Sequence, residues 1–245
     1  MNNKRLPERL LKIASLVPRN SVAADVGTDH CRLPVYLITS GICRHVYATE
    51  IKHGPYKRAE ESISQAKLSD RITLFLCDGL EKCPVDSTDT VIIAGMGGET
   101  VSGIISRAPR TASKRLLILQ PMTKSERLRQ WLCENEYTII TEYLTEDAGK
   151  IYPVILATGG KVRTDYSAAE LAAGKFEFFS AEPLAKKHID LLIKKYSKEI
   201  TGIKSAGIIE IEKEKNLRKS TEILYDLTEM RRDICADCRG DSGLF

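Results

Sequence analysis

Hydrophobic and polar positions alternate between two patterns along the first two thirds of the chain. Short apolar runs, such as residues 21–26 and 90–94, predict strands. Segments whose apolar residues recur every three or four positions, such as residues 6–17 and 53–68, predict amphipathic helices. Further strands are expected at 45–51, 72–77 and 115–119, and further helices at 33–39, 99–108 and 124–134.

This alternation predicts an α/β fold built on a parallel sheet. Strand–helix–strand units cross over with one hand and place neighbouring strands parallel. The strands are almost uninterrupted apolar runs, which is typical of a sheet covered on both faces. Two further strands at 137–144 and 151–158, on either side of Glu146-Asp147-Ala148-Gly149, are expected to form a hairpin that closes a domain of residues 1–160.

The pattern changes in residues 161–245, which we expect to form a second, helical domain. Residues 166–180 are alanine-rich and predict a helix. Apolar residues then follow the spacing of a coiled-coil seam: Ala185, Ile189, Leu192, Tyr196, Ile200 and Ile203. Ser205-Ala206-Gly207 interrupts this helix, and a second charged helix contains Leu217, Leu224 and Leu227. These features predict an antiparallel α-helical coiled-coil hairpin.

Composition places the chain among soluble globular proteins. It has 245 residues, 42% of them hydrophobic and 29% charged. No apolar run approaches the roughly 20 residues of a membrane span, and the N-terminus does not resemble a signal peptide. We therefore expect a cytoplasmic protein with no membrane partner, and a monomer is the favoured oligomeric state. Seven cysteines are scattered, and the Cys235–Cys238 pair has no second ligand pair, so no metal site is expected.

Positive charge is concentrated near the N-terminus. Residues 1–60 contain ten Lys/Arg and five Asp/Glu, whereas the whole chain has a net charge of only +4. Such a region could border an anionic partner such as RNA, and an ordinary solvated helix face is the alternative.

The loop after the first strand carries the most specific chemistry. Asp25-Val26-Gly27-Thr28-Asp29-His30 matches neither the dinucleotide-binding glycine pattern nor the phosphate-binding P-loop. Carboxylates repel phosphates and suit a ligand with a cationic or hydroxyl-bearing part. Gly27 would let the backbone approach that ligand closely.

Acids at the next two strand ends complete the ligand-binding pattern. Glu50 is placed to bind ribose hydroxyls, and Asp78 is placed to reach an adenine amino group. An adenosine that carries an amino-acid cation and no phosphate is S-adenosylmethionine. Taken singly, Asp25 could be a helix cap, Glu50 a surface acid and Asp78-Gly79 a turn. The set predicts a methyltransferase whose cofactor contacts Asp25, Gly27, Asp29, His30, Glu50, Ile51, Asp78, Gly79, Gly95 and Met96.

Five motifs together resemble the bacterial tRNA (adenine-22-N1)-methyltransferase family, TrmK: ADVGTDHCRLP, EIKHGPYKRA, CDGL, IAGMGGE and a Gln120-Pro121 turn. The resemblance covers about residues 5–160, and the tail matches in kind. It implies a Rossmann-like class I methyltransferase domain, a C-terminal helical coiled-coil domain, S-adenosylmethionine as methyl donor and tRNA as substrate. The family usually has an aromatic residue in place of Arg32 and Asn in place of Met122.

Methyl transfer to adenine N1 needs orientation more than acid–base chemistry. N1 carries a free lone pair at neutral pH, so the enzyme must align it with the methyl group and tolerate the cationic product. The base must also leave its stack, because N1 lies on the Watson–Crick edge. Asp29 and His30 are the first candidates beside the reacting atoms. Met96 is expected to face the base and Gln120 to donate a hydrogen bond to it, although a plain glycine turn is the alternative at 95–98.

Two further sets of residues are expected to contact the RNA. Basic side chains around the cleft should bind phosphates, and the candidates are Arg5, Arg9, Lys12, Arg32, Lys57 and Arg58. Gly97, Gly98 and Pro121 should border the target base. Two readings stay open at this point: a methyltransferase acting on another RNA, a protein or a small molecule, and a non-catalytic module that binds an adenosyl ligand or RNA.

Overall fold

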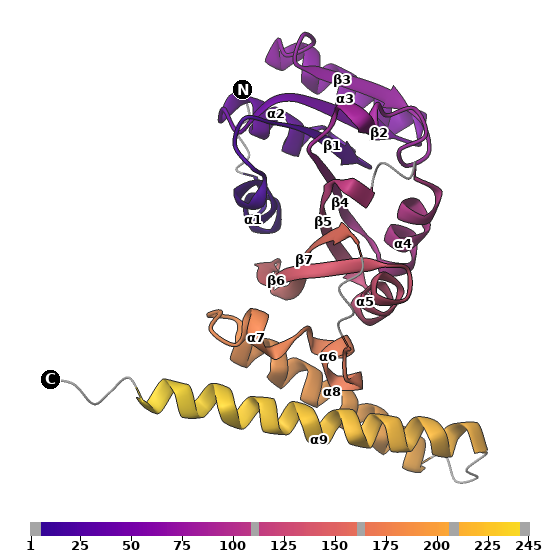
Figure 1. Ribbon diagram of the computed structural model, residues 1–245, viewed down its shortest axis with the longest axis vertical. Coiled ribbons are helices and arrows are strands. Elements are labelled where there is room, and N and C mark those ends of the chain that lie inside the picture. Colours follow the sequence, from indigo (N-terminus) through magenta and orange to yellow (C-terminus); the bar gives the residue numbers. More distant parts are fainter. Residues whose placement is uncertain (1–5, 109–112, 161–164, 206–210, 241–245) are drawn as a thin grey trace, which may run out of the picture. The chain divides into compact units, whose positions relative to one another are not determined.

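The computed structural model describes residues 6–108, 113–160, 165–205 and 211–240, with the backbone alone at 236–240 (Figure 1). Contacts divide the chain into two units, and each is described by itself. The first comprises Met1–Thr141 and Thr145–Thr164, and the second comprises Glu142–Leu144 and Asp165–Phe245.

A seven-stranded sheet forms the centre of the first unit, and its order is β3-β2-β1-β4-β5-β7-β6. The parallel strands are β1 (Ser21–Val26), β2 (Cys43–Glu50), β3 (Ile72–Leu76), β4 (Thr90–Gly97) and β5 (Leu116–Thr123). β7 (Lys150–Gly159) runs antiparallel to β5, and β6 (Tyr137–Asp147) lies outside it. The predicted α/β fold with a closing pair of strands is confirmed.

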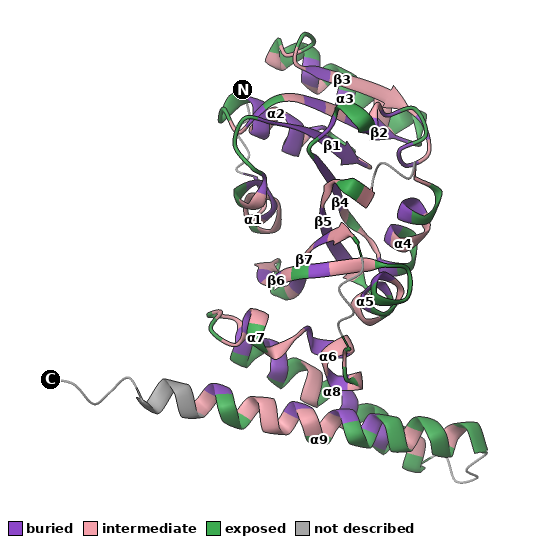
Figure 2. Cartoon of the chain, in the orientation of Figure 1, coloured by how far each residue is buried: buried purple, intermediate pink, exposed green. Residues whose placement is uncertain are grey.

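Helices cover the sheet, and β1 is fully buried beneath them. All six β1 residues are buried, as expected for an apolar strand with neighbours on both sides and helices over both faces (Figure 2). α1 (Glu8–Leu16), α2 (Arg32–Thr39) and α3 (His53–Ala66) pack in series. α4 (Gly98–Arg107) packs on α5 (Ser125–Glu134), and a short 3-10 turn, η1 (Val85–Ser87), precedes β4.

Two strands run further than the sequence pattern predicts. β4 continues to Gly97, into the glycine segment formed by residues 95–98. β5 continues through Gln120 and Pro121, where a turn was expected. The β4–β5 register shifts around Met96, which pairs with Pro121. Pro121 lies beyond the β5–β7 ladder, which pairs residues 117–119 of β5, and beside the register shift of β4, and such an irregular position is where a strand tolerates proline.

The closing hairpin has a shorter turn than the predicted four residues. β6 includes Glu146 and Asp147, so only Ala148 and Gly149 remain between the strands. Both have positive φ, +49° and +76°, which is the two-residue turn whose twist matches that of the flanking strands. The extra strand length places Asp147 at the end of β6.

The second unit is helical. α6 (Ala168–Ala173) and α7 (Phe176–Phe179) replace the single helix predicted at 166–180, because Gly174 has φ +101° and ends α6. α8 (Ala185–Ser205) and α9 (Ile211–Gly240) pack along each other. They are antiparallel, since Asp190 pairs with Arg231 while Glu199 accepts a hydrogen bond from Ser220. Ala206 and Gly207 of the predicted interruption lie outside the described residues.

The predicted seam of α8 faces the interior of this unit. Ala185, Ile189, Tyr196 and Ile200 are buried, while Leu192 and Ile203 are half-buried. The buried apolar residues described on α9 are Ile223, Leu227 and Ile234. A helical hairpin is therefore observed, and a supercoil of the coiled-coil type stays a prediction.

Candidate functional site

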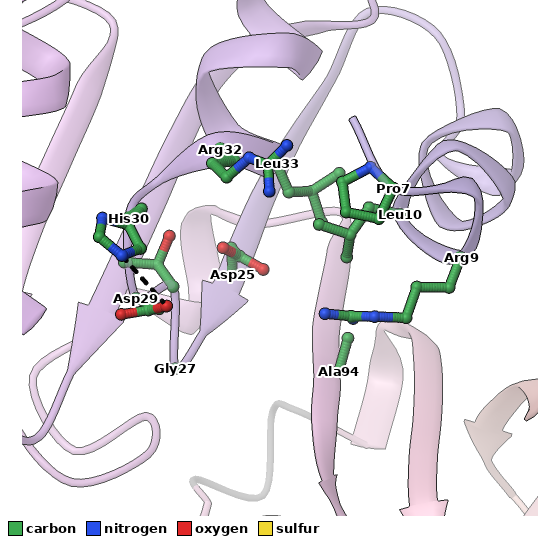
Figure 3. A pocket seen from close by; sticks show the side chains of 11 residues that line it. Pro7, Arg9, Leu10, Asp25, Gly27, Asp29, His30, Arg32, Leu33 and Ala94 are labelled. Atoms are coloured by element: carbon green, nitrogen blue, oxygen red, sulfur yellow. Dashed lines mark ion pairs between the residues drawn. The ribbon is translucent and has the colours of Figure 1, made fainter. Parts of the chain in front are cut away.

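A pocket of about 140 Å³ lies at the carboxyl ends of β1 and β4, between the β1 loop and α1 (Figure 3). In an open parallel sheet this is the edge where ligands bind. Six residues singled out in the sequence line it together: Arg9, Asp25, Gly27, Asp29, His30 and Arg32. The lining also includes Pro7, Leu10, Thr28, Leu33 and Ala94, which the motifs did not single out. Thr28 lay inside the quoted loop, whereas only the packing of α1 brings Pro7 and Leu10 here.

Gly27 makes the turn that exposes the backbone to this pocket. Its φ is +72°, and its N–H donates to the Thr49 carbonyl at 2.9 Å, as does the Thr28 N–H at 3.0 Å. A Cβ at this position would lie 2.1 Å from the Met96 Cε. The left-handed conformation favours glycine here, and a larger residue would also displace the flexible tip of the Met96 side chain, which reaches this turn.

Asp25 is a buried carboxyl group that lines the pocket. It is 5% exposed. Its pKa is raised from 3.8 to about 6, mainly by burial and to a smaller extent by the negative charge of Glu50. A cation bound in the pocket would favour the ionised carboxylate again, so this side chain suits a positively charged ligand.

Glu50 connects the β1 loop to the end of β2. One carboxylate oxygen accepts the Asp29 N–H at 3.2 Å, and the other accepts the N–H groups of Ile51 at 3.0 Å and Lys52 at 3.1 Å. These bonds hold the carboxylate at the strand end. Oε1 thus already accepts two N–H groups, whereas Oε2 accepts one and keeps a second acceptor position to which a ribose hydroxyl can donate.

Asp29 and His30 lie at the open side of the pocket. Asp29 has a left-handed backbone with φ +48°. Its carboxylate pairs with Arg58 Nη2 at 3.2 Å and lies 3.7 Å from His30 Nε2. Both side chains are about half exposed or more, which leaves them accessible to a large substrate.

Asp78 lies outside the lining of this pocket and has a partner of its own. Its carboxylate forms an ion pair with Arg107 Nη2 of α4 at 3.2 Å. Gly79 follows with φ +55°, and a Cβ there would lie 3.1 Å from Ile104 Cγ2. The Arg107 partner was missed from the sequence, because nothing local in a helix indicates a contact 29 residues away.

Gln120 hydrogen-bonds to the glycine segment at the end of β4, which comprises residues 95–98. This side chain is 0% exposed. Its Oε1 accepts the Gly95 N–H at 3.2 Å, and its Nε2 donates to the Pro121 carbonyl at 3.1 Å and to Met122 Sδ at 3.4 Å. The amide is thus engaged within the protein, and its predicted contact with a target base stays a prediction.

The remaining glycines and Met96 have distinct surroundings. Met96 is half-buried, and its side chain reaches the Gly27 turn. A Cβ on Gly98 would lie 2.3 Å from the Lys124 carbonyl oxygen, which explains this glycine by packing. Gly97 precedes α4 as its N-cap.

The basic residues expected to bind phosphates are spread over three elements. Arg9 and Arg32 line the pocket, whereas Lys57 and Arg58 are exposed on α3. Lys12 is half-buried on α1. Arg5 lies outside the described residues. Their contacts with RNA stay predictions.

The part of the chain that the structure describes has neither a metal-binding cluster nor a helix suited to span a membrane. Among the residues that the structure describes, no group of three or more His, Cys, Asp or Glu side chains is arranged to hold a metal ion. Within the same residues, no helix combines the length and the apolar character that crossing a membrane requires.

Comparisons with known proteins identify the family. Residues 6–155 match the methyltransferase domain model. The chain is 32% identical over 206 residues to the Bacillus subtilis tRNA (adenine(22)-N(1))-methyltransferase, covering 84% of this chain and 85% of that protein.

Solved structures agree with this assignment. The B. subtilis TrmK crystal structure has a TM-score of 0.82 and 27% identity, covering 93% of this chain and 99% of that one. A putative tRNA (m1A22) methyltransferase from Streptococcus pneumoniae, solved in complex with S-adenosyl-L-methionine, has a TM-score of 0.72 and 26% identity, covering 91% and 98%. The resemblance drawn from the five motifs is confirmed: this chain belongs to the tRNA (adenine(22)-N(1))-methyltransferase family.

Proposed function

We propose that this protein transfers a methyl group from S-adenosylmethionine to N1 of adenine 22 in tRNA, in the cytoplasm and as a monomer. The pocket at the Gly27 turn is the main support for the proposal. It combines a backbone turn without a side chain, at Gly27, with the buried carboxyl group of Asp25, which suits a cation. Family membership favours tRNA over a protein or small-molecule substrate, and the complete strand-end acids favour an enzyme over a non-catalytic module.

The residues present fit S-adenosylmethionine. Asp25 would hold the positively charged amino-acid part, the Gly27 turn would admit it, and Glu50 would accept ribose hydroxyls. Asp78, Gly79 and Ile51 would border the adenine, and Ile51 is exposed as a flat apolar contact requires. When bound, this cofactor supplies an electrophilic methyl group on a sulfonium.

The chain's task in the reaction is orientation and charge stabilisation. Adenine N1 is nucleophilic without a base, so the site must hold it in line with the methyl group. Asp29 lies at the open side of the pocket, where its negative charge would stabilise the cationic methylated base. His30 lies beside Asp29 and would contact the base by hydrogen bonding or stacking. Met96 would offer it an apolar, polarizable face.

Nucleoside mass spectrometry tests this function directly. Unmodified tRNA transcripts with adenine at position 22 are incubated with S-adenosylmethionine and the full chain, then digested. We expect 1-methyladenosine from these transcripts and none from a matched transcript with guanine at position 22. Absence of 1-methyladenosine from both would overturn the proposal.

Phosphate contacts are tested by the salt dependence of tRNA binding. Arg32 lines the pocket and Lys57 is exposed on α3. Replacing each by Gln should weaken binding and reduce the slope of log K against log salt by about 1 per lost phosphate contact. An unchanged slope would remove that residue from the RNA-binding surface.

A further inference from the structure

Arg9 has partners on two strands that are far from it in the sequence. Its Nε forms an ion pair with Asp147 Oδ2, at the end of β6, at 3.1 Å. Its Nη1 donates to Gln120 Oε1, on β5, at 3.3 Å. The Arg9 side chain is only 22% exposed. A guanidinium has donors in a fixed planar fork, so one side chain can bind both acceptors at once.

Gln120 links Arg9 to the glycine segment at residues 95–98. The Oε1 that accepts from Arg9 also accepts the Gly95 N–H at 3.2 Å. Gly95 has φ +80°, and a Cβ on it would lie 3.7 Å from Arg9 Nη1. The guanidinium therefore lies over the bend where β4 leaves its regular register with β5. The next residue, Met96, reaches the Gly27 turn.

We propose that Arg9 is a positioning residue for methyl transfer: through Asp147 and Gln120 it holds the Gly95-Met96 backbone beside the cofactor turn. This inference rests on the proposed function and deepens it. It gives Arg9 a role different from the phosphate contact that its charge suggests, because its donors already bind two acceptors within the protein.

Charge-conserving and charge-removing variants separate the two roles. Arg9→Lys keeps the charge but loses the fork, and Arg9→Gln loses both. If Arg9 acts by positioning, both variants should lower kcat about tenfold or more at saturating tRNA, because misplaced groups lose rate in the bound complex. The slope of tRNA affinity against salt should stay that of the unaltered protein. Lys57→Gln, an exposed basic residue on α3, is the comparator for loss of a phosphate contact.

Asp147 provides an independent variant. Asp147→Asn should lower kcat in the same direction, and Arg9→Gln combined with Asp147→Asn should lose no more than Arg9→Gln alone, since the two act as one unit. Restoration of kcat by Arg9→Lys, or a reduced salt slope with unchanged kcat, would overturn the proposal.

Hydrogen exchange tests the same contact without using activity. The Gly95 amide donates to Gln120 and should be protected in the unaltered protein. Peptides covering residues 95–98 should exchange faster in both Arg9→Gln and Asp147→Asn, while peptides from β2 should not. Unchanged exchange at 95–98 overturns the positioning role. Failure of the unaltered protein to make 1-methyladenosine, with faster exchange in the variants, would instead overturn the proposed function.

Discussion

At the scale of single residues, the proposed site contains a carboxyl group, that of Asp25, whose ionised form is disfavoured by burial. Asp25 is buried and also lines the pocket, and its pKa is raised from 3.8 to about 6, mainly by burial. The folded protein therefore holds this proton more tightly than the unfolded chain does. Asp25 thus contributes most to stability at low pH, and this contribution falls as the pH rises from about 4 to about 6.

Asp25→Asn should remove this pH dependence. At pH 7.5 we expect the variant to be more stable than the unaltered protein, by up to about 3 kcal/mol, because the unfavourable buried charge is gone. At pH 4 the two should be closer. Urea unfolding at both pH values measures the difference, and identical pH dependence in the two proteins would contradict the assignment.

The same substitution should weaken cofactor binding. An amide cannot balance the positive charge that the Asp25 carboxylate would face. Calorimetry with S-adenosylmethionine at pH 7.5 should therefore show lower affinity for Asp25→Asn, so the variant gains stability and loses function.

Glu50 gives a second prediction at this scale. Both carboxylate oxygens accept backbone N–H groups in the structure. Glu50→Gln replaces one acceptor oxygen with an NH₂ donor that faces backbone N–H groups. A lost buried hydrogen bond costs about 1–3 kcal/mol, and the carboxylate would no longer be held where it is proposed to accept the ribose hydroxyls. We expect about a tenfold or larger loss of S-adenosylmethionine affinity by calorimetry. Unchanged affinity would show that Glu50 serves only the backbone.

At the scale of elements, the Gly27 turn after β1 lines the pocket with backbone that carries no side chain, as the proposed cofactor site requires. Gly27 and Gly41 both have positive φ, +72° and +66°. A Cβ on Gly27 would meet Met96 at 2.1 Å, whereas a Cβ on Gly41 meets nothing within 4 Å. The two glycines therefore separate the cost of backbone conformation from the cost of filling the site.

Gly41→Ala should cost about 1–2 kcal/mol of stability and leave cofactor binding unchanged. Gly27→Ala should cost only slightly more, because the flexible tip of Met96 can move aside, and it should also abolish S-adenosylmethionine binding. Combining Gly27→Ala with Met96→Ala should leave most of the stability loss in place, because that loss comes from backbone strain. Thermal melts and calorimetry of the set provide the measurement, and equal effects at Gly27 and Gly41 would argue against a special role for this turn.

At the scale of the whole molecule, each of the two units has its own buried residues. In the helical unit Leu227 is 0% exposed, whereas Tyr225 on the same helix is 66% exposed. Leu227→Ala should lower stability by about 2–5 kcal/mol, since it leaves a cavity. Tyr225→Ala is the matched control and should change stability little.

Circular dichroism melts at 222 nm measure this loss of helix. Because the pocket proposed to bind the cofactor is lined entirely by residues of the first unit, S-adenosylmethionine affinity should not change in Leu227→Ala at temperatures where the variant is folded. A parallel loss of affinity would show that the two units depend on each other.

Much of the molecule was predictable because its determinants are local. The period of the apolar positions placed β1 at its observed bounds and placed α3 and α8 within a few residues. The shift of the Gln120-Pro121 turn into β5 was not predictable, because it depends on the partner strand. The single helix predicted at 166–180 was wrong for the same kind of reason: Gly174 breaks it where the chain must turn.

The order of elements, the α/β fold and the acids at three strand ends follow from the sequence, since parallel strands bring their carboxyl ends to one edge. The motifs by which the family is recognised are also visible in the sequence. Which side chains contact one another depends on the tertiary structure. Arg9 meets Gln120 from 111 residues away, and Arg58 meets Asp29 from 29 residues away. Such pairs depend on how helices pack on the sheet, and that packing is set by contacts across the whole unit rather than by any local pattern.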